Sequence, residues 1–204
     1  MDIYQQFIYG LHETKWYELI AVVFGIASVW LNRNENILVY PVGLVNTILY
    51  IVISIQSHLI GEASVNLYYT IVSIYGWILW AKKDKSNQHV LHITWSGTKE
   101  WIGHLMFFAG FYVAIFFCLS YLKKEFLPGA LPAADAFASA TAFTGMWLMA
   151  RKKIESWFWW IATNIASIPL YFVKGLVFTS FYYLVLLILA VSGLIEWMKK
   201  EKKQ

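Results

Sequence analysis

The chain has 204 residues, of which 59% are hydrophobic and 19% aromatic, and its net charge is +4 at neutral pH. This hydrophobic share exceeds the roughly 45–50% of a soluble domain, so we expect an all-α integral membrane protein with no soluble domain left over. The single cysteine, Cys118, excludes an internal disulfide and a thiolate metal cluster.

Seven apolar runs approach the ~17–25 residues that a spanning helix needs, and we predict seven transmembrane helices. The runs cover residues 17–31, 37–55, 63–80, 102–122, 133–149, 156–173 and 178–198. The first fifteen residues lack a basic start and a small-residue cleavage site, so we expect no cleavable signal peptide. The first spanning helix then acts as the insertion signal.

The basic residues are distributed unevenly between the two ends of these helices. Twelve follow the first, third, fifth and seventh runs, and four lie on the opposite side. The twelve are Arg33, Lys82, Lys83, Lys85, Lys99, Arg151, Lys152, Lys153, Lys199, Lys200, Lys202 and Lys203; the four are Lys15, Lys123, Lys124 and Lys174. By the positive-inside rule we expect the C-terminus in the cytoplasm and the N-terminus outside. Topology explains these charges, so we expect no nucleic-acid partner.

The second and third runs each carry a polar face. Asn46 and Tyr50 are four residues apart in the second run, and Asn66, Tyr69 and Ser73 follow one another at helical spacing in the third. A single tyrosine is more simply explained by packing with a local hydroxyl bond. An asparagine at this depth must face protein, water or a ligand, so the faces resemble the lining of a path rather than a lipid surface.

The connection after the third run holds His89 and His92, at a spacing that a metal site can use. No carboxylate or cysteine set stands nearby, so we expect a solvated loop without a metal. The fourth run is aromatic on all sides and has only His104, near its start, as a basic or acidic residue. We predict a linker helix that faces lipid or a partner subunit. The fifth run is dense in small residues, which lets helix backbones approach closely.

The sixth run opens with W-F-W-W-I-A-T-N. Trp157, Trp160 and Asn164 are spaced three and four residues apart, so two indoles and a carboxamide share one helix face. An unpaired amide in hydrocarbon costs about 2–7 kcal/mol, which predicts a binding face here. Pro169 lies further along the same run and should kink the helix.

The chain matches itself at an offset near 117 residues. Asn46 matches Asn164 at an offset of 118, Trp80 matches Trp197 at 117, and a one-residue gap in the third helix reconciles the two offsets. Further matches join Arg33 to Arg151, Gly76 to Gly193, Lys82 to Lys199 and Lys83 to Lys200. The first three helices thus correspond to the last three.

We therefore expect residues 16–83 to form a first three-helix bundle and residues 131–200 a second. Residues 84–130 supply the cytoplasmic connection, the linker helix and an outer loop. One linker helix makes both bundles enter the membrane in the same direction, which gives a 3+1+3 parallel repeat. Asn46 and Asn164 then face each other across a central cleft; the alternative is that they only hydrogen-bond one bundle to the other.

The motifs W-Y-E-L, R-N-E-N, Y-P-V-G-L-V-N, S-I-Y-G-W-I-L-W and W-x-x-W-x-x-x-N, together with the repeat, resemble the PnuC family of bacterial nicotinamide riboside transporters over essentially the whole chain. The resemblance implies a fold similar to the SWEET sugar transporters, a homotrimer in the bacterial inner membrane and facilitated diffusion of nicotinamide riboside. The Pro-Gln dipeptide common among SWEET proteins is absent. Val39 and Val42 also stand where the second repeat has Trp157 and Trp160, so the two walls of the site differ.

Residue chemistry agrees with this substrate. An Asn or Gln side chain matches the nicotinamide carboxamide with one donor and one acceptor, and an indole or phenol face suits the cationic pyridinium ring. The substrate-binding candidates are Asn46, Tyr50, Gln56, Asn66, Tyr69, Ser73, Trp157, Trp160 and Asn164. No Arg or Lys lies at mid-membrane, so we expect the mononucleotide, with its phosphate, to be rejected.

The helices also lack a mid-depth acid with a partner, as ion-coupled carriers commonly use. We expect an uncoupled facilitator that works by alternating access, with net uptake maintained by phosphorylation of the product inside the cell. The flex points of such a motion are Gly25, Gly43, Gly145, Pro169 and Gly193.

Two other classes of function stay in view. A sugar or another small neutral solute could use the same fold, because indoles also stack on sugars. An enzyme would need a nucleophile and base, or metal ligands, at matched depth on neighbouring helices. We find no such set, and we expect no catalytic residue and no cofactor.

Overall fold

The computed structural model describes residues 3–13, 16–56, 60–125 and 131–203, and the regular elements in these ranges are all α-helices. They are α1 (Ile3–Glu13), α2 (Trp16–Arg33), α3 (Val39–Gln56), α4 (Ile60–Ala81), α5 (Thr98–Glu125), α6 (Pro132–Ala150), α7 (Ser156–Val173) and α8 (Val177–Glu201). Each predicted apolar run lies within one of the helices α2–α8 or within two residues of its start. The short helix α1 precedes them and is not predicted by the hydropathy pattern. Lys15 lies outside the described residues.

The chain is a multi-pass membrane protein. Within the described ranges, α3, α5 and α8 are long and apolar enough to cross a membrane, and α1 with α2, taken as one bent span, would make a fourth. The other helices contain more Asn, Ser, Thr, Tyr, Trp or charged residues, and they do not meet the same criteria of length and mean hydropathy. The full number of seven spans therefore stays a prediction.

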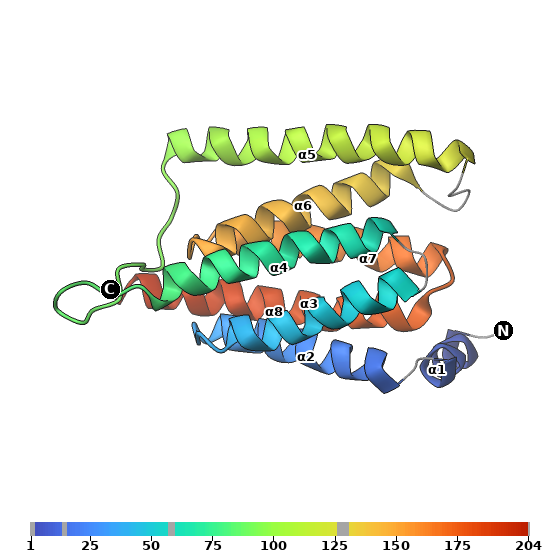
Figure 1. Cartoon of the computed structure of the whole chain (residues 1–204), viewed down its shortest axis with the longest axis horizontal. Helices are drawn as coiled ribbons and strands as arrows, with labels where there is room; N and C mark the ends of the chain where they lie inside the picture. Colours follow the sequence, from blue (N-terminus) through green and yellow to red (C-terminus); the bar gives the residue numbers. More distant parts are fainter. Residues whose placement is uncertain (1–2, 14–15, 57–59, 126–130, 204) are drawn as a thin grey trace.

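Six of the described helices form a closed ring, in which each packs against two other members of the ring. Figure 1 shows these helices from the side. The order around the ring is α2, α3, α4, α6, α7, α8 and back to α2. Helix α5 lies outside the ring against α6, and α1 packs on α8. Helices on opposite sides of this ring can meet only through side chains that point into its interior.

A tyrosine on α3 packs on a glycine of α4. The Tyr40 ring lies so close to Gly76 that a Cβ atom there would come within 2.5–2.8 Å of three atoms of its phenol group. Trp80, one turn further along α4, meets the Tyr40 ring edge to face, with centroids 5.2 Å apart and an interplanar angle of 89°. Glycine is needed at position 76 because any side chain would displace the tyrosine.

The same arrangement recurs 117 residues later, between α7 and α8. Trp157 lies on Gly193, where a Cβ atom would come within 2.6 Å of three ring carbons. Trp197 meets the Trp157 ring edge to face at 5.5 Å and 90°. A close glycine contact and a perpendicular aromatic pair are thus built twice, at equivalent places in two helix pairs.

The turns between α2 and α3 and between α6 and α7 also match at 117 residues. Glu35 and Lys152 each hold a left-handed backbone conformation, with φ of 60° and 52°. Their amides donate to equivalent carbonyls, Glu35 to Asn32 at 2.9 Å and Lys152 to Met149 at 3.0 Å. Both helix ends are therefore closed by the same turn.

These contacts correct the register of the predicted repeat, because an offset of 117 residues holds from the first turn onward. Asn46 then corresponds to Thr163, and Asn164 corresponds to Thr47. Asn46 and Thr163 both bond toward the first helix of their own group, α2 and α6 respectively. At the offset of 117 residues that these contacts share, Asn46 and Asn164 are not at equivalent positions.

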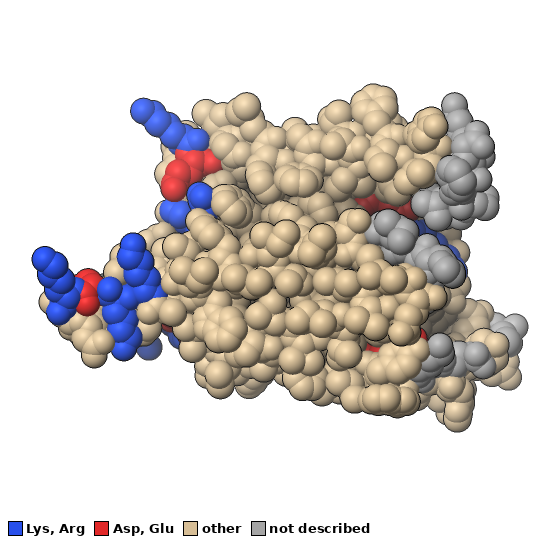
Figure 2. Space-filling view, viewed as in Figure 1, with Lys and Arg blue, Asp and Glu red and all other residues tan. Residues whose placement is uncertain are grey.

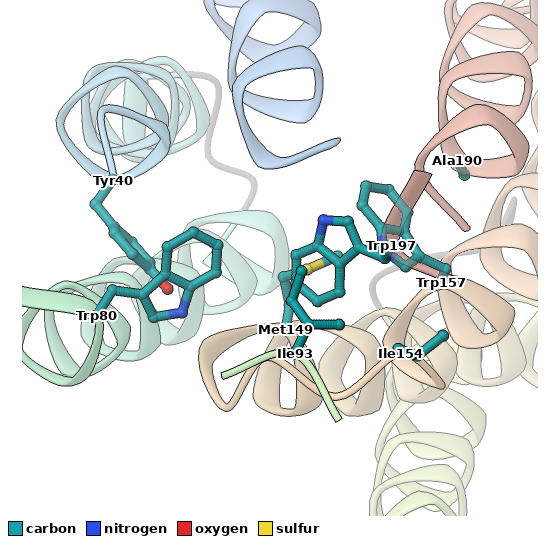
Figure 3. Packing of buried hydrophobic residues seen from close by; sticks show 8 residues of the cluster. All are labelled: Tyr40, Trp80, Ile93, Met149, Ile154, Trp157, Ala190 and Trp197. Carbon is teal, nitrogen blue, oxygen red and sulfur yellow. The ribbon is translucent and has the colours of Figure 1, made fainter. Parts of the chain in front are cut away.

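The hydrophobic core gathers where α4 and α8 end, beside the two equivalent turns (Figure 3). Its buried members are Tyr40, Trp80, Ile93, Met149, Ile154, Trp157, Ala190 and Trp197. Lysine and arginine side chains collect at this same end of the molecule, where the C-terminus lies (Figures 1 and 2). We call it the basic end.

The connection between α4 and α5 is docked rather than solvated throughout, which corrects the expectation from sequence. Thr94 pairs with the α6–α7 turn: its amide donates to the Lys152 carbonyl at 3.2 Å, and its carbonyl accepts from the Ile154 amide at 3.1 Å. Ile93 is 1% exposed, while His92 is exposed. The segment folds back because Ile93 has an apolar pocket to fill.

Helix α5 is held to the ring by one face only. The buried His104 contacts the Ser96 hydroxyl at 2.9 Å, and Phe108 lies 5.1 Å from the Trp159 ring of α7. Its outward side chains include the exposed Leu105 and Phe117. An apolar outer face suits contact with lipid or with a partner.

Candidate functional site

Aromatic side chains meet across the interior of the ring. Tyr69 on α4 lies 6.3 Å from the Trp160 ring on α7, centroid to centroid. Helices α4 and α7 are not neighbours in the ring, so this contact passes through its interior. Two of the predicted residues, one from each half of the chain, are therefore brought together.

Two tyrosines of α8, Tyr182 and Tyr183, complete this cluster, and they are not among the candidates predicted from the sequence. Tyr182 lies near Tyr50 of α3, and Tyr183 lies near Tyr69 of α4. Neither α3 nor α4 neighbours α8, so these phenols also reach across the ring. The Tyr183 ring stacks on Tyr171 at 5.1 Å and 12°. The repeat could have found Tyr183, because it stands 117 residues after Asn66.

Asn46 does not join the two halves of the chain. Its Nδ2 donates to the Ala21 carbonyl of α2 at 2.6 Å, within its own half. The same amide lies next to Gly25, beside the Tyr182 hydroxyl. Asn46 therefore stabilises the α2–α3 contact and also reaches the edge of the aromatic cluster. The sequence also allowed a hydrogen bond between Asn46 and Asn164 that would join the two bundles. In the structure Asn46 bonds to α2 instead.

Asn164 is the second carboxamide, and its environment differs. It is 3% exposed, and no hydrogen bond joins its side chain to another of the described residues. Thr163 beside it is bonded to Thr141 of α6 at 2.9 Å, which fixes the rotation of α7. A buried amide without a protein partner needs water or a ligand, since leaving it unsatisfied costs about 1–3 kcal/mol.

The structure separates the two tryptophans of the predicted face. Trp160 points toward Gly145 and the aromatic cluster, with its Nε1 3.2 Å from where a Cβ atom would stand at Gly145. Trp157 is 1% exposed and belongs to the core at the basic end. Trp157 and Trp160 are one helical turn apart, yet the first lies in the core and the second in the aromatic cluster. The role of Trp157 is therefore packing.

The remaining predicted residues lie on α3 and α4. Ser73 is buried, Asn66 is half-buried, and Gln56 is the exposed last residue of α3. The Thr70 hydroxyl donates to the Asn66 carbonyl at 2.9 Å and lies 3.0 Å from the Thr47 hydroxyl, which ties α4 to α3. Asn66 and Ser73 stay candidates, while the position of Gln56 favours solvent contact.

The cluster offers aromatic faces, hydroxyls and carboxamides without charge. Helices α3 and α7 contain no Lys, Arg, Asp or Glu. Such a lining can bind a small aromatic solute that is neutral or cationic, through ring faces and through paired amide hydrogen bonds. It offers no ammonium or guanidinium group to a phosphate.

Gly25 brings α8 close to α2 at the edge of this cluster, and we expect Gly25→Ala to lower the melting temperature of the detergent-purified protein. The added methyl group would overlap the Tyr182 hydroxyl. Overpacking of this kind costs about 1–3 kcal/mol, or roughly 2–4 °C for each kcal/mol. The double variant Gly25→Ala/Tyr182→Phe removes the hydroxyl and should recover most of the loss.

Gly43→Ala is the matched control, because a methyl group there meets only Ser28 Cβ at an ordinary 3.8 Å. Equal melting temperatures for Gly25→Ala and Gly43→Ala would contradict the placement of Tyr182.

A family model described as "Nicotinamide mononucleotide transporter" matches residues 15–199. The nicotinamide riboside transporter PnuC of Escherichia coli (strain K12) is 24% identical, over 96% of this chain and 90% of that protein. The PnuC protein of Neisseria mucosa is 25% identical, over 98% and 78% respectively. The riboflavin/roseoflavin transporter RibM of Streptomyces davaonensis is 22% identical, over 92% and 87%.

A solved structure shares the fold. The crystal structure of the vitamin B3 transporter PnuC superposes with a TM-score of 0.72 at 23% sequence identity. The alignment covers 98% of this chain and 88% of that one. The likeness thus extends over the ring, the outer helix α5 and the connections between them.

Proposed function

The chain belongs to the nicotinamide mononucleotide transporter family, and we propose that it carries nicotinamide riboside across the membrane. Family and relatives are transporters and not enzymes. The observation that carries the proposal is the contact of Tyr69 with Trp160 across the ring, one helical turn from the buried Asn164, whose side chain bonds to no other described residue. Aromatic faces suit a pyridinium ring, and a free carboxamide suits the carboxamide of nicotinamide.

Charge favours the riboside over the mononucleotide. A phosphate taken into the ring would lose water without gaining a cationic partner, because α3 and α7 carry no Lys or Arg. Riboflavin, the substrate named for one relative, is the second candidate, since its flat ring would also suit aromatic faces. A sugar would contact the tyrosine hydroxyls and the Trp160 indole. It has no carboxamide to pair with the donor and the acceptor of Asn164.

We place the binding site at the axis of a 3+1+3 parallel repeat of seven transmembrane helices. Helices α2–α4 and α6–α8 would be the two bundles, within residues 16–83 and 131–200, and α5 the linker within residues 84–130. Support comes from the glycine contacts and turns that recur at 117 residues and from the ring order, which is unchanged when α2–α4 and α6–α8 are exchanged. Transport would follow from rocking of one bundle against the other.

The basic end is assigned to the cytoplasm of a bacterium, in its inner membrane. This orientation is supported by the collection of Lys and Arg at the end where the C-terminus lies (Figure 2) and puts the N-terminus outside. The outward apolar face of α5 would meet lipid and, in a homotrimer, a second copy. Its exposed side chains include Ile102, Leu105, Met106, Val113 and Phe117.

Net uptake would need no ion gradient. Helices α3 and α7 hold no acid that could take up a proton or a sodium ion, so the substrate would run down its own gradient. Phosphorylation of the riboside by another protein would then keep its internal concentration low.

Exchange of radiolabelled nicotinamide riboside in proteoliposomes tests this proposal. We expect exchange that unlabelled riboside inhibits, that the mononucleotide and glucose leave unchanged, and that an imposed pH gradient does not drive. Inhibition by riboflavin alone would transfer the assignment to the second candidate. Accumulation of riboside in step with the proton gradient would contradict the uncoupled mechanism.

A further inference from the structure

A cavity of about 480 Å³ opens at the basic end, away from the aromatic cluster. It is lined by the α2–α3 turn with Glu35, by Trp80 and His89, and by Lys152 of the α6–α7 turn. Its walls therefore come from both halves of the chain. The volume is within the ~300–1,000 Å³ of small-molecule sites.

The Lys152 ammonium group lies in the wall of this cavity, between a carboxylate and an indole ring. Lys152 Nζ lies 2.7 Å from Glu35 Oε1 and 4.7 Å from the centroid of the Trp80 ring. The two charged side chains are 6% and 20% exposed. Glu35 keeps a weaker contact with Lys200 at 3.5 Å. A carboxylate and an indole face are thus arranged around one cation, as in sites for organic cations.

The same ion pair ties the two halves together at the basic end. Glu35 and Lys152 are equivalent residues of the two turns, and two indole hydrogen bonds cross beside them. Trp80 Nε1 donates to the Ala150 carbonyl at 3.2 Å, and Trp197 Nε1 donates to the Asn32 carbonyl at 3.0 Å. The ion pair therefore lies at the end of the ring where the two halves are joined.

We propose that this cavity is an exit site for the cationic substrate, in which the pyridinium ring takes the place of the Lys152 ammonium between Glu35 and Trp80. The proposal rests on the function proposed above. A pyridinium ring offers the two interactions that Lys152 makes, attraction to the carboxylate and a cation–π contact with the indole. Displacing Lys152 also releases the tie between the two turns, so the substrate opens its own way out.

If the ion pair only holds the two halves together, its two charge-removing variants should behave alike. If the cavity binds a cation, they should behave differently. Glu35→Gln and Lys152→Gln both break the ion pair. If the pair only holds the two halves together, both variants should change the exchange rates in the same direction. In a cation site, Glu35 attracts the substrate and Lys152 competes with it. The two variants should then act in opposite directions, and only on a substrate that carries the positive charge.

The experiment compares nicotinamide riboside with its 1,4-dihydro form, which has nearly the same shape and a neutral ring. Exchange of both is measured in proteoliposomes, and the ratio of their rates cancels differences in protein amount. We expect Glu35→Gln to lower the ratio of cationic to neutral exchange at least fivefold and Lys152→Gln to raise it at least twofold. The control variants Glu100→Gln and Lys153→Gln break a neighbouring ion pair, 3.0 Å long, outside the cavity and should leave the ratio unchanged.

A ratio that shifts in the same direction in both cavity variants, or in neither, would overturn the exit site. A wild-type protein that exchanges neither form would instead contradict the proposed function, so the two failures are distinguishable.

Discussion

Replacement of Gly193 by alanine is expected to cause a large loss of stability, because the added methyl group has no room beside the Trp157 ring. The new Cβ atom would come within 2.6 Å of three carbons of the Trp157 ring. Trp157 is enclosed by Trp197, whose Nε1 is bonded to the Asn32 carbonyl at 3.0 Å, so the ring has little room to move. We expect a cost of about 3 kcal/mol, a fall of roughly 6–12 °C in melting temperature.

Three further variants make this result specific. Gly76→Ala meets Tyr40 in the equivalent place and should cost a similar amount. Gly110→Ala on α5 meets nothing within 4 Å and should gain up to about 1 kcal/mol from better helix propensity. In Gly193→Ala/Trp157→Phe the smaller ring should restore part of the loss. A melting temperature for Gly193→Ala within 2 °C of wild type would show that Trp157 does not lie on α8.

Asn164→Ala is expected to weaken riboside binding by about 10–100-fold while the melting temperature stays within a few degrees of wild type. The carboxamide is buried and bonded to no other described residue, so its removal breaks no contact of the fold. It does remove a donor and an acceptor from the substrate, worth about 1–3 kcal/mol. Calorimetric titration of the purified protein with nicotinamide riboside measures the change.

Asn46→Ala and Thr163→Ser are the comparison variants for this experiment. Asn46 donates to the Ala21 carbonyl, so its loss should lower stability together with binding. Thr163→Ser keeps the hydroxyl that meets Thr141 and should leave both unchanged. Normal riboside binding by Asn164→Ala would remove Asn164 from the site and leave the tyrosines and Trp160 as its candidates.

The glycines that the sequence suggests as flex points have a packing role in the structure. Gly25, Gly145 and Gly193 each lie against a large side chain of a neighbouring helix. A hinge needs free space on both sides of the backbone, whereas these positions are filled by a phenol or an indole. If one bundle rocks against the other, we therefore expect each glycine to move together with the aromatic side chain that it contacts.

Contacts between helices were beyond the reach of sequence reasoning. The spacing of Trp157, Trp160 and Asn164 predicts one shared face, yet Trp157 fills the core and Trp160 reaches the aromatic cluster. Spacing gives direction around a helix, but the neighbours at each depth decide what a side chain meets. Tyr182 and Tyr183 were missed for the same reason, since their partners lie on helices far away in the sequence.

The sequence by itself determined the class of the protein and the course of its helices. The run predicted at 156–173 begins and ends with α7, because the length of an apolar stretch and the polar residues that bound it are local properties. Only the tertiary structure decided three further features. The two turns match at an offset of 117 residues, Ile93 is buried, and Glu35 forms an ion pair with Lys152. These depend on which surfaces meet when the ring closes, and packing of that kind is not encoded in any one stretch of the chain.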